Sequence, residues 1–76
     1  MPRDLPSSIG PRSLVVLEFV RRFQEREGFS PSQQDIADAL GFPGHTLALY
    51  HLRRLEEAGL ISRAAGAARA IRLRRQ

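Results

Sequence analysis

The side chains in this sequence that are best suited to specific chemistry are arginines, and they gather toward the C-terminal end. Residues 1–44 contain five arginines and six acidic residues, whereas residues 45–76 contain seven arginines and two acidic residues. From Leu60 onward there are five arginines and no acidic residue. A guanidinium forms paired hydrogen bonds with phosphate oxygens and with guanine. This arginine-rich segment therefore indicates binding to a polyanion such as nucleic acid.

Other kinds of chemistry find little support. The 76 residues form one small domain and contain no cysteine, which excludes disulfides, iron–sulfur clusters and thiolate zinc sites. The two histidines, His45 and His51, are about 240° apart around a helix, so they cannot bind one metal ion as an i, i+4 pair does. The sequence has no histidine–carboxylate constellation and no glycine-rich phosphate-binding loop. We therefore expect no enzymatic activity, no metal site and no cofactor.

No segment of the sequence has the character of a membrane span. The longest apolar runs are far shorter than the roughly 20 residues that a spanning helix needs. The first ten residues also lack the apolar core of a signal peptide. We therefore expect a cytoplasmic protein without a membrane partner.

The middle of the chain has the pattern of two helices joined by a tight turn. Ser32 and Asp35 form the residue pair that caps a helix start, and Gly41 is suited to end that helix. The Phe-Pro-Gly that follows forms the turn, because proline cannot continue a helix. We predict helices over about 32–40 and 45–58. This is the helix-turn-helix pattern, whose second helix enters the major groove of DNA.

The N-terminal part is predicted to be a flexible arm followed by another helix. Residues 1–9 are rich in proline and serine and poor in apolar residues, so we expect an arm. A helix is predicted over about 11–27, because proline suits the first helical position. Its core face carries apolar residues at helical spacing, namely Val16, Phe19, Val20 and Phe23.

The C-terminal part is predicted to be a β-hairpin. Strands are predicted over about 60–64 and 69–74, on either side of a glycine-containing turn. In the second strand Ile71 and Leu73 alternate with arginines, which is the period of a half-buried strand. Three helices and a hairpin predict a mainly α, three-helix winged helix-turn-helix domain over residues 10–76.

Two strings make the sequence similar to the N-terminal DNA-binding domain of LexA-type SOS repressors, PSQQDIADALGF and GAARAIRL. The similarity covers about residues 9–73, and the second string is the more specific. The resemblance implies a bacterial winged helix-turn-helix that binds double-stranded DNA at the nucleoid and represses transcription. In that family a self-cleaving Ser–Lys protease domain follows the DNA-binding domain. This sequence contains no lysine, so we expect no self-cleavage.

The predicted recognition helix departs from that family. The family's helix opens with SPNAAEEHL, whose Asn and Glu read bases, whereas residues 44–52 here are GHTLALYHL. The resemblance therefore extends to the scaffold and not to the operator sequence. We expect bases to be read by Thr46, Leu47 and Tyr50, through hydroxyl hydrogen bonds and contacts with thymine methyl groups.

A helical wheel at about 100° per residue divides the second helix of the motif into a core face, an outer face and flanks. The core face packs inside the domain, so the outer face and the flanks are left for a partner. The outer face holds Thr46, Tyr50, Arg53 and Glu57, the flanks hold Leu47, Leu49 and Arg54, and the core face holds Ala48, Leu52 and Leu55, with His51 at its border.

Contacts with phosphates or with the minor groove are expected chiefly from arginines. A charged strand can also serve only to keep a sheet edge from pairing, but five arginines without one acidic residue favour DNA contact. The free amides at a helix start can hold a phosphate as well. Each phosphate contact releases counterions, so binding should weaken steeply with salt. The expected residues are Ser32, Gln33, Arg53, Arg54, Arg63, Arg69, Arg72, Arg74 and Arg75.

Two hypotheses of function stay open from the sequence. The first is sequence-specific binding to double-stranded DNA, as a homodimer on a palindromic site because one small module covers little DNA. The second is a protein–protein interaction module that uses Leu47, Leu49 and Tyr50 as an apolar contact face. The acid-free hairpin favours the first and the two leucines favour the second. The operator, the sign of regulation, the oligomeric state and whether the chain is part of a longer product stay open.

Overall fold

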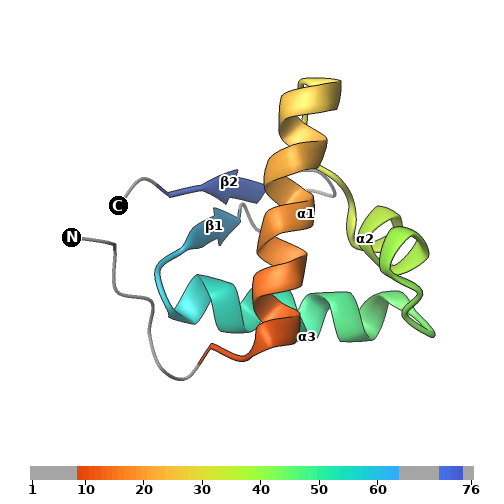
Figure 1. Cartoon of the computed structure of the whole chain (residues 1–76). Helices are drawn as coiled ribbons and strands as arrows, with labels where there is room; N and C mark the ends of the chain where they lie inside the picture. Colours follow the sequence, from red (N-terminus) through yellow and green to blue (C-terminus); the bar gives the residue numbers. More distant parts are fainter. Residues whose placement is uncertain (1–8, 64–70, 75–76) are drawn as a thin grey trace.

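The fold consists of three helices followed by a two-stranded antiparallel hairpin (Figure 1). The computed structural model describes residues 9–63 and 71–74. Most of the predicted arm, the predicted hairpin turn, Arg69 and Arg75 lie outside the described residues. The architecture confirms the mainly α, winged helix-turn-helix class. In chain order the elements are α1 (Pro11–Glu27), α2 (Gln33–Leu40), α3 (His45–Glu57), β1 (Ile61–Arg63) and β2 (Ile71–Leu73).

Helix α1 is the longest element, and its inner face forms one wall of the core. It begins at Pro11, where the missing N–H is not needed, and it ends at Gly28, which takes the left-handed conformation with φ of 84°. Val16 and Val20 are fully buried, as predicted. The buried position one turn before Val16 is Ser13, which the prediction did not include.

Phe23 was predicted to lie in the core, and this was wrong. Figure 1 shows the C-terminal end of α1 projecting beyond the hairpin and α2, so the core ends before this turn. Phe23 is only half-buried. Its ring packs against Phe19 and Phe29, each at a centroid distance of 5.7 Å. Phe19 itself packs against the edge of the core.

Helices α2 and α3 form the helix-turn-helix. At the start of α2, Ser32 Oγ accepts a hydrogen bond from the Asp35 N–H at 3.0 Å, and the Asp35 carboxylate accepts one from the Ser32 N–H at 3.1 Å. This is the capping box that the sequence predicts. Gly41 ends α2 with a left-handed φ of 74°. Helix α3 then packs across both α1 and α2.

The side chains of α3 sort as the helical wheel predicts. Ala48, Leu52 and Leu55 are fully buried, and His51 is 6% exposed. The outer face is exposed and the flanks are half-buried, so periodicity alone identified the surface that α3 presents. The exposed residues are Thr46, Tyr50, Arg53 and Glu57, and the half-buried ones are Leu47, Leu49 and Arg54.

The hairpin contributes its apolar side chains to the same core. Ile61 and Ile71 are buried, and Leu73 packs against the core. The register places Ile61 opposite Leu73 and Arg63 opposite Ile71. Directly opposite residues in an antiparallel pair share one face, so Arg63 lies on the core side of the hairpin.

Hydrogen bonds fasten the hairpin to the helical part. The side-chain amide of Gln24 in α1 donates to the Ile71 carbonyl oxygen at 2.8 Å, and the Ile71 N–H donates to Ser30 Oγ at 3.4 Å. The Arg74 N–H donates to the Leu60 carbonyl oxygen at 3.0 Å, one residue beyond the paired strands. A two-stranded hairpin alone is marginal in water, so these contacts determine where it lies.

Candidate nucleic-acid interface

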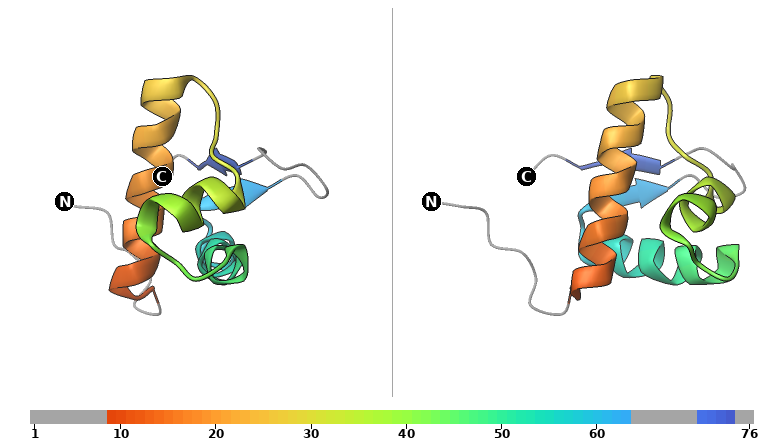
Figure 2. Two further views of the ribbon diagram at one scale, coloured as in Figure 1. Left: turned by 90° about the vertical axis from the view of Figure 1, so that its right-hand side faces the viewer. Right: turned by 45° about the vertical axis from the view of Figure 1, so that its right-hand side comes forward.

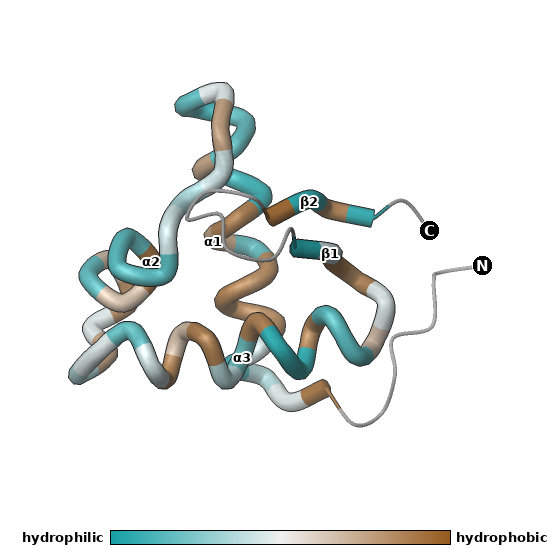
Figure 3. Tube along the Cα trace, turned by 180° about the vertical axis from the view of Figure 1, so that it is seen from behind, coloured by the Kyte–Doolittle hydropathy of each residue, from teal (hydrophilic) through white to brown (hydrophobic). Residues whose placement is uncertain are grey.

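Helix α3 lies between the start of α1 and the hairpin. In the left view of Figure 2, α3 is seen nearly end-on, with the first turn of α1 on one side and β1 on the other. Figure 3 shows the same arrangement from behind, with α3 on the near face, the hairpin above it and the start of α1 below it. The surface of α3 is therefore bordered on both sides by other elements of the domain.

The predicted base-reading residues differ in how far they reach from α3. Thr46 is exposed and Tyr50 is 51% exposed, whereas Leu47 is half-buried. Leu47 lines an open apolar groove of about 390 Å³ together with Val15 of α1 and Pro43 of the turn. The apolar flank of α3 is thus partly covered by the domain itself.

The two arginines of α3 have different surroundings. Arg53 is exposed on the outer face. Arg54 is half-buried on the flank that faces α1, with its guanidinium carbon 5.8 Å from the centre of the Tyr50 ring. A guanidinium at this distance is attracted to the face of a tyrosine ring. The contact favours an Arg54 side chain that lies along the helix rather than one directed straight outward.

The arginines of the hairpin divide between its two faces. Arg72 and Arg74 are exposed, on the face opposite to Ile71. Arg63 lies on the core side, its side chain is 24% exposed, and its Nε is 3.3 Å from Glu56 Oε1 of α3. The prediction grouped Arg63 with the other hairpin arginines as a DNA contact, but its charge is paired with Glu56 within the domain.

Ser32 and Gln33, at the start of α2, were predicted as a phosphate contact. The capping box places the Asp35 carboxylate at this helix end. A carboxylate there already neutralises the positive end of the helix dipole and would repel a phosphate. Ser32 therefore serves as a helix cap. Gln33 follows the cap directly and is half-buried.

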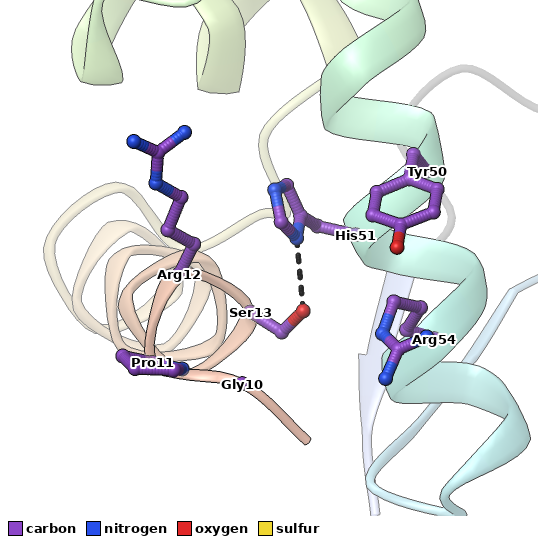
Figure 4. Close-up of a pocket in the computed structure, with 7 residues that line it drawn as sticks. All are labelled: Gly10, Pro11, Arg12, Ser13, Tyr50, His51 and Arg54. Carbon is purple, nitrogen blue, oxygen red and sulfur yellow. Dashed lines mark hydrogen bonds between the residues drawn. The ribbon is translucent and has the colours of Figure 1, made fainter. Parts of the chain in front are cut away.

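A hydrogen bond between Ser13 and His51, which the sequence analysis did not predict, joins α1 to α3. Ser13 Oγ and His51 Nδ1 are 2.9 Å apart, and both residues are buried (Figure 4). Burial lowers the pKa of His51, and the positive charges of Arg12 and Arg54 lower it further. A neutral imidazole therefore forms this contact at neutral pH. A serine at the core-facing spacing before Val16 was the available signal for it.

Beside this hydrogen bond an open pocket of about 460 Å³ separates the first turn of α1 from the middle of α3. Its lining includes the side chains of Arg12, Tyr50 and Arg54 (Figure 4). Neither Arg12 nor this pocket was among the predicted sites.

Three further findings concern metal binding, buried polar groups and membrane spans among the described residues. Within residues 9–63 and 71–74, no group of three or more His, Cys, Asp or Glu residues is placed to hold a metal ion. Every buried side-chain nitrogen or oxygen in the same ranges has a hydrogen-bond partner. No helix among the described residues is long and apolar enough to cross a membrane.

Comparisons with known proteins point to one family. The family model of the LexA DNA binding domain matches residues 7–70. The chain is 50% identical over 59 residues to the LexA repressor of Stenotrophomonas maltophilia, a match that covers 78% of this chain and 28% of that protein. It is 47% identical over 62 residues to the LexA repressor of Burkholderia cenocepacia, covering 82% and 29%. With the LexA repressor of Verrucomicrobium spinosum it shares 43% over 60 residues, covering 79% and 30%. The chain thus spans less than a third of the length of these relatives.

Proposed function

The chain belongs to the LexA DNA-binding domain family, and we propose that it is a sequence-specific double-stranded DNA-binding module that represses transcription. The relatives are named repressors, and a bound winged helix can block a promoter by occupying it. We place its action at the bacterial nucleoid. The proposal concerns the DNA-binding step, because the chain covers only the part of these relatives that the family model describes.

The observation that carries the proposal is the surface of α3. Thirteen residues of helix present an outer face with Thr46, Tyr50 and Arg53 exposed, while the opposite face is fully packed. A helix of this length is about 20 Å long and fits a major groove about 12 Å wide. With a hairpin on one side and the start of α1 on the other, α3 is the element that would enter the groove.

We propose that bases are read by Thr46, Leu47 and Tyr50. The Thr46 hydroxyl can donate to or accept from a base edge, and its methyl group can contact a thymine methyl. Leu47 can make the same apolar contact from the flank. The family's reading residues are not retained here, so we do not carry the family's operator sequence over to this chain.

Phosphate or minor-groove contacts are proposed for the exposed arginines on the hairpin side and on α3. Arg53, Arg72 and Arg74 are exposed and form no ion pair with a described residue, which leaves their full charge for the DNA. Arg63 would contribute less because Glu56 already pairs with it. Ser32 and Gln33 would contribute least. Arg54, Arg69 and Arg75 complete the proposed set.

A second copy of the chain would extend the contact. A single small module buries about 600–1,000 Å² on DNA, which gives limited specificity. Two copies on a palindromic site, with half-sites one helical turn or more apart, would double the reading surface. We therefore propose a homodimer on DNA.

One observation favours the alternative, a protein-interaction module. Val15 and Tyr50 are large side chains that are 53% and 51% exposed, and half-buried Leu47 lines a groove with Val15. In this hypothesis another protein would bind the apolar side chains of Leu47, Leu49 and Tyr50. This hypothesis does not require the exposed arginines of the hairpin.

Selection from random duplexes, followed by fluorescence anisotropy at two salt concentrations, distinguishes these functions. We expect salt-sensitive binding to all duplexes and at least about a thousandfold tighter binding to one enriched palindrome. The variant Tyr50→Ala should lower affinity for the palindrome more than for random DNA. Absence of binding even at low salt would contradict DNA binding and favour a protein partner.

A further inference from the structure

The first residue of β2 has two backbone groups that point away from β1. The Arg74 N–H donates to the Leu60 carbonyl oxygen, so these two residues form a hydrogen-bonded pair of the hairpin. Hydrogen-bonded and non-hydrogen-bonded pairs alternate along antiparallel strands. Ile71 and its partner Arg63 lie an odd number of positions from that pair, so they form a non-hydrogen-bonded pair. The N–H and the carbonyl oxygen of Ile71 therefore point to the outer edge of β2.

Two side chains of the helical part bind both of these groups. The side-chain amide of Gln24, in the last part of α1, donates to the Ile71 carbonyl oxygen at 2.8 Å. The Ile71 N–H donates at 3.4 Å to Ser30 Oγ, in the segment between α1 and α2. Ile71 is 6% exposed and Ser30 is 5% exposed, so water has little access to this place. We call these two hydrogen bonds the β2 clip. They supply the partners that buried backbone groups require.

The β2 clip lies directly before an exposed arginine of the hairpin. Arg72 follows Ile71 in the chain and is exposed. Successive side chains of a strand point to opposite faces, so Arg72 points outward because Ile71 points into the core. Figure 1 shows β2 beginning beside α1 and pointing away from it. The orientation of the strand at Ile71 therefore determines where the Arg72 guanidinium lies relative to α3.

Apolar packing alone defines the position of β2 less closely than the β2 clip does. The strand is three residues long, and a two-stranded hairpin is marginal in water. The hydrophobic effect holds Ile71 in the core but has no preferred direction. Hydrogen bonds weaken steeply when donor and acceptor are misaligned. Two of them on one residue therefore fix both the position and the tilt of the strand against α1.

We propose that Gln24 and Ser30 are positioning residues for DNA binding, which hold β2 so that Arg72 reaches the DNA backbone. The proposal rests on the proposed function, in which exposed arginines of the hairpin contact phosphates or the minor groove. Both residues act through Arg72 and need no DNA contact of their own. Gln24 contributes more than Ser30, because typical N–H···O distances are about 2.7–3.2 Å and only its hydrogen bond is that short.

Neutral substitutions in the β2 clip test the proposal. Gln24→Met removes the donor but keeps the length and the neutrality of the side chain. It should weaken DNA binding by about three- to tenfold and lower the slope of log K against log salt by up to about 1, because Arg72 then contacts a phosphate for less of the time. Ser30→Ala should have a smaller effect in the same direction. The matched control is Ile36→Val, which trims the core at α2 and should keep the wild-type salt slope.

A double-mutant cycle separates positioning from a general loss of stability. If Gln24 acts through Arg72, adding Gln24→Met to Arg72→Gln should change the DNA affinity by less than about twofold. Adding Gln24→Met to Arg53→Gln should give the full loss, because Arg53 is exposed on α3 and does not depend on the position of β2. Equal losses in the two backgrounds would show that Gln24 does not act through Arg72, and would overturn the proposal.

Amide hydrogen exchange of the free chain tests the β2 clip without DNA. In Gln24→Met the Arg74 N–H should exchange at least about tenfold faster relative to the N–H of buried Leu52, which reports global unfolding. In Ile36→Val this ratio should stay as in the wild-type chain. An unchanged ratio in Gln24→Met would show that the β2 clip does not hold the strand.

The same measurements separate failure of this proposal from failure of the proposed function. If the wild-type chain binds no DNA, the proposed function fails, and the positioning role fails with it even where hydrogen exchange shows that the β2 clip holds the strand. If the wild-type chain binds DNA and Gln24→Met keeps its affinity and salt slope, only the positioning role is overturned.

Discussion

The two sides of α3 are built differently. On the α1 side, two helices are joined by a buried side-chain hydrogen bond between Ser13 and His51. On the hairpin side, two three-residue strands are held by apolar packing of Ile61 and Ile71 and by hydrogen bonds of the Gln24 and Ser30 side chains with the Ile71 backbone. Both sides present arginines and both contribute to the hydrophobic core, but the α1 side adds a hydrogen bond between two buried side chains of different helices. The two sides of the interface should therefore be separable by mutation.

The largest expected effect comes from the hairpin side. Ile61 is 1% exposed, so Ile61→Ala should lower the free energy of unfolding by about 2–5 kcal/mol through lost burial and the cavity left behind. Urea denaturation measures the change. Ile61→Val, which removes one methylene, should lose only about 0.5–1.5 kcal/mol and remain folded for DNA binding. A loss in Ile61→Ala no larger than that of Ile61→Val would show that the hairpin is not anchored in the core.

Ser13→Ala affects the other side and should have an intermediate effect. It leaves the Nδ1 atom of buried His51 without its hydrogen-bond partner, at a cost of about 1–3 kcal/mol in the free energy of unfolding. The matched control is Ser62→Ala, a half-buried strand position, which should change stability by less than about 0.5 kcal/mol. Equal stability of the two variants would mean that the Ser13–His51 contact does not fasten α1 to α3.

The smallest effect is a pH dependence that belongs to the α1 side alone. The pKa of His51 is lowered from 6.5 in the folded chain, first by burial and then by the two arginines. Above 6.5 the imidazole is neutral in both states and contributes no pH dependence. As the pH falls below 6.5 the unfolded chain takes up the proton first, so stability declines until the folded-state pKa is reached. The groups that face His51 are Arg12 and Ser13 of α1, Phe42 of the turn, and Tyr50 and Arg54 of α3.

Urea denaturation at a series of pH values measures this decline in stability. The series runs from about 7.5 to about 5, on both sides of the usual histidine pKa. The variant His51→Gln is the comparison, because it removes the buried imidazole and should therefore lose this decline. A flat profile in the wild-type chain would contradict a depressed pKa for His51. The hairpin, which contains no histidine, should not alter the profile when Ile61 is changed to Val.

The sequence predicted the parts of the molecule that depend on local periodicity. The outer face of α3 followed from the helical repeat, and the exposure of Arg72 and Arg74 followed from the strand repeat. The capping box at Ser32 and Asp35 followed from a three-residue spacing. These features can be predicted without knowing how the helices and strands pack against one another. The similarity to LexA-type repressors, based on two strings, agrees with the family match.

The features that the sequence did not predict depend on docking. Ser13 and His51 are 38 residues apart, and Gln24 and Ile71 are 47 apart, so no local pattern pairs them. The apolar spacing of α1 continues through Phe23, but Phe23 is only half-buried and packs against Phe19 and Phe29 rather than in the core. Whether an arginine stays available or pairs within the domain, as Arg63 does with Glu56, also depends on tertiary geometry.

The most direct test of the central claim is NMR mapping of the backbone amides on addition of the enriched palindromic duplex. We expect shifts in two regions: the outer face of α3 around Thr46 and Tyr50, and the strand around Arg72. The projecting end of α1 near Phe23 should remain unchanged. Shifts centred on the projecting end of α1, with none on the outer face of α3, would contradict α3 as the recognition helix.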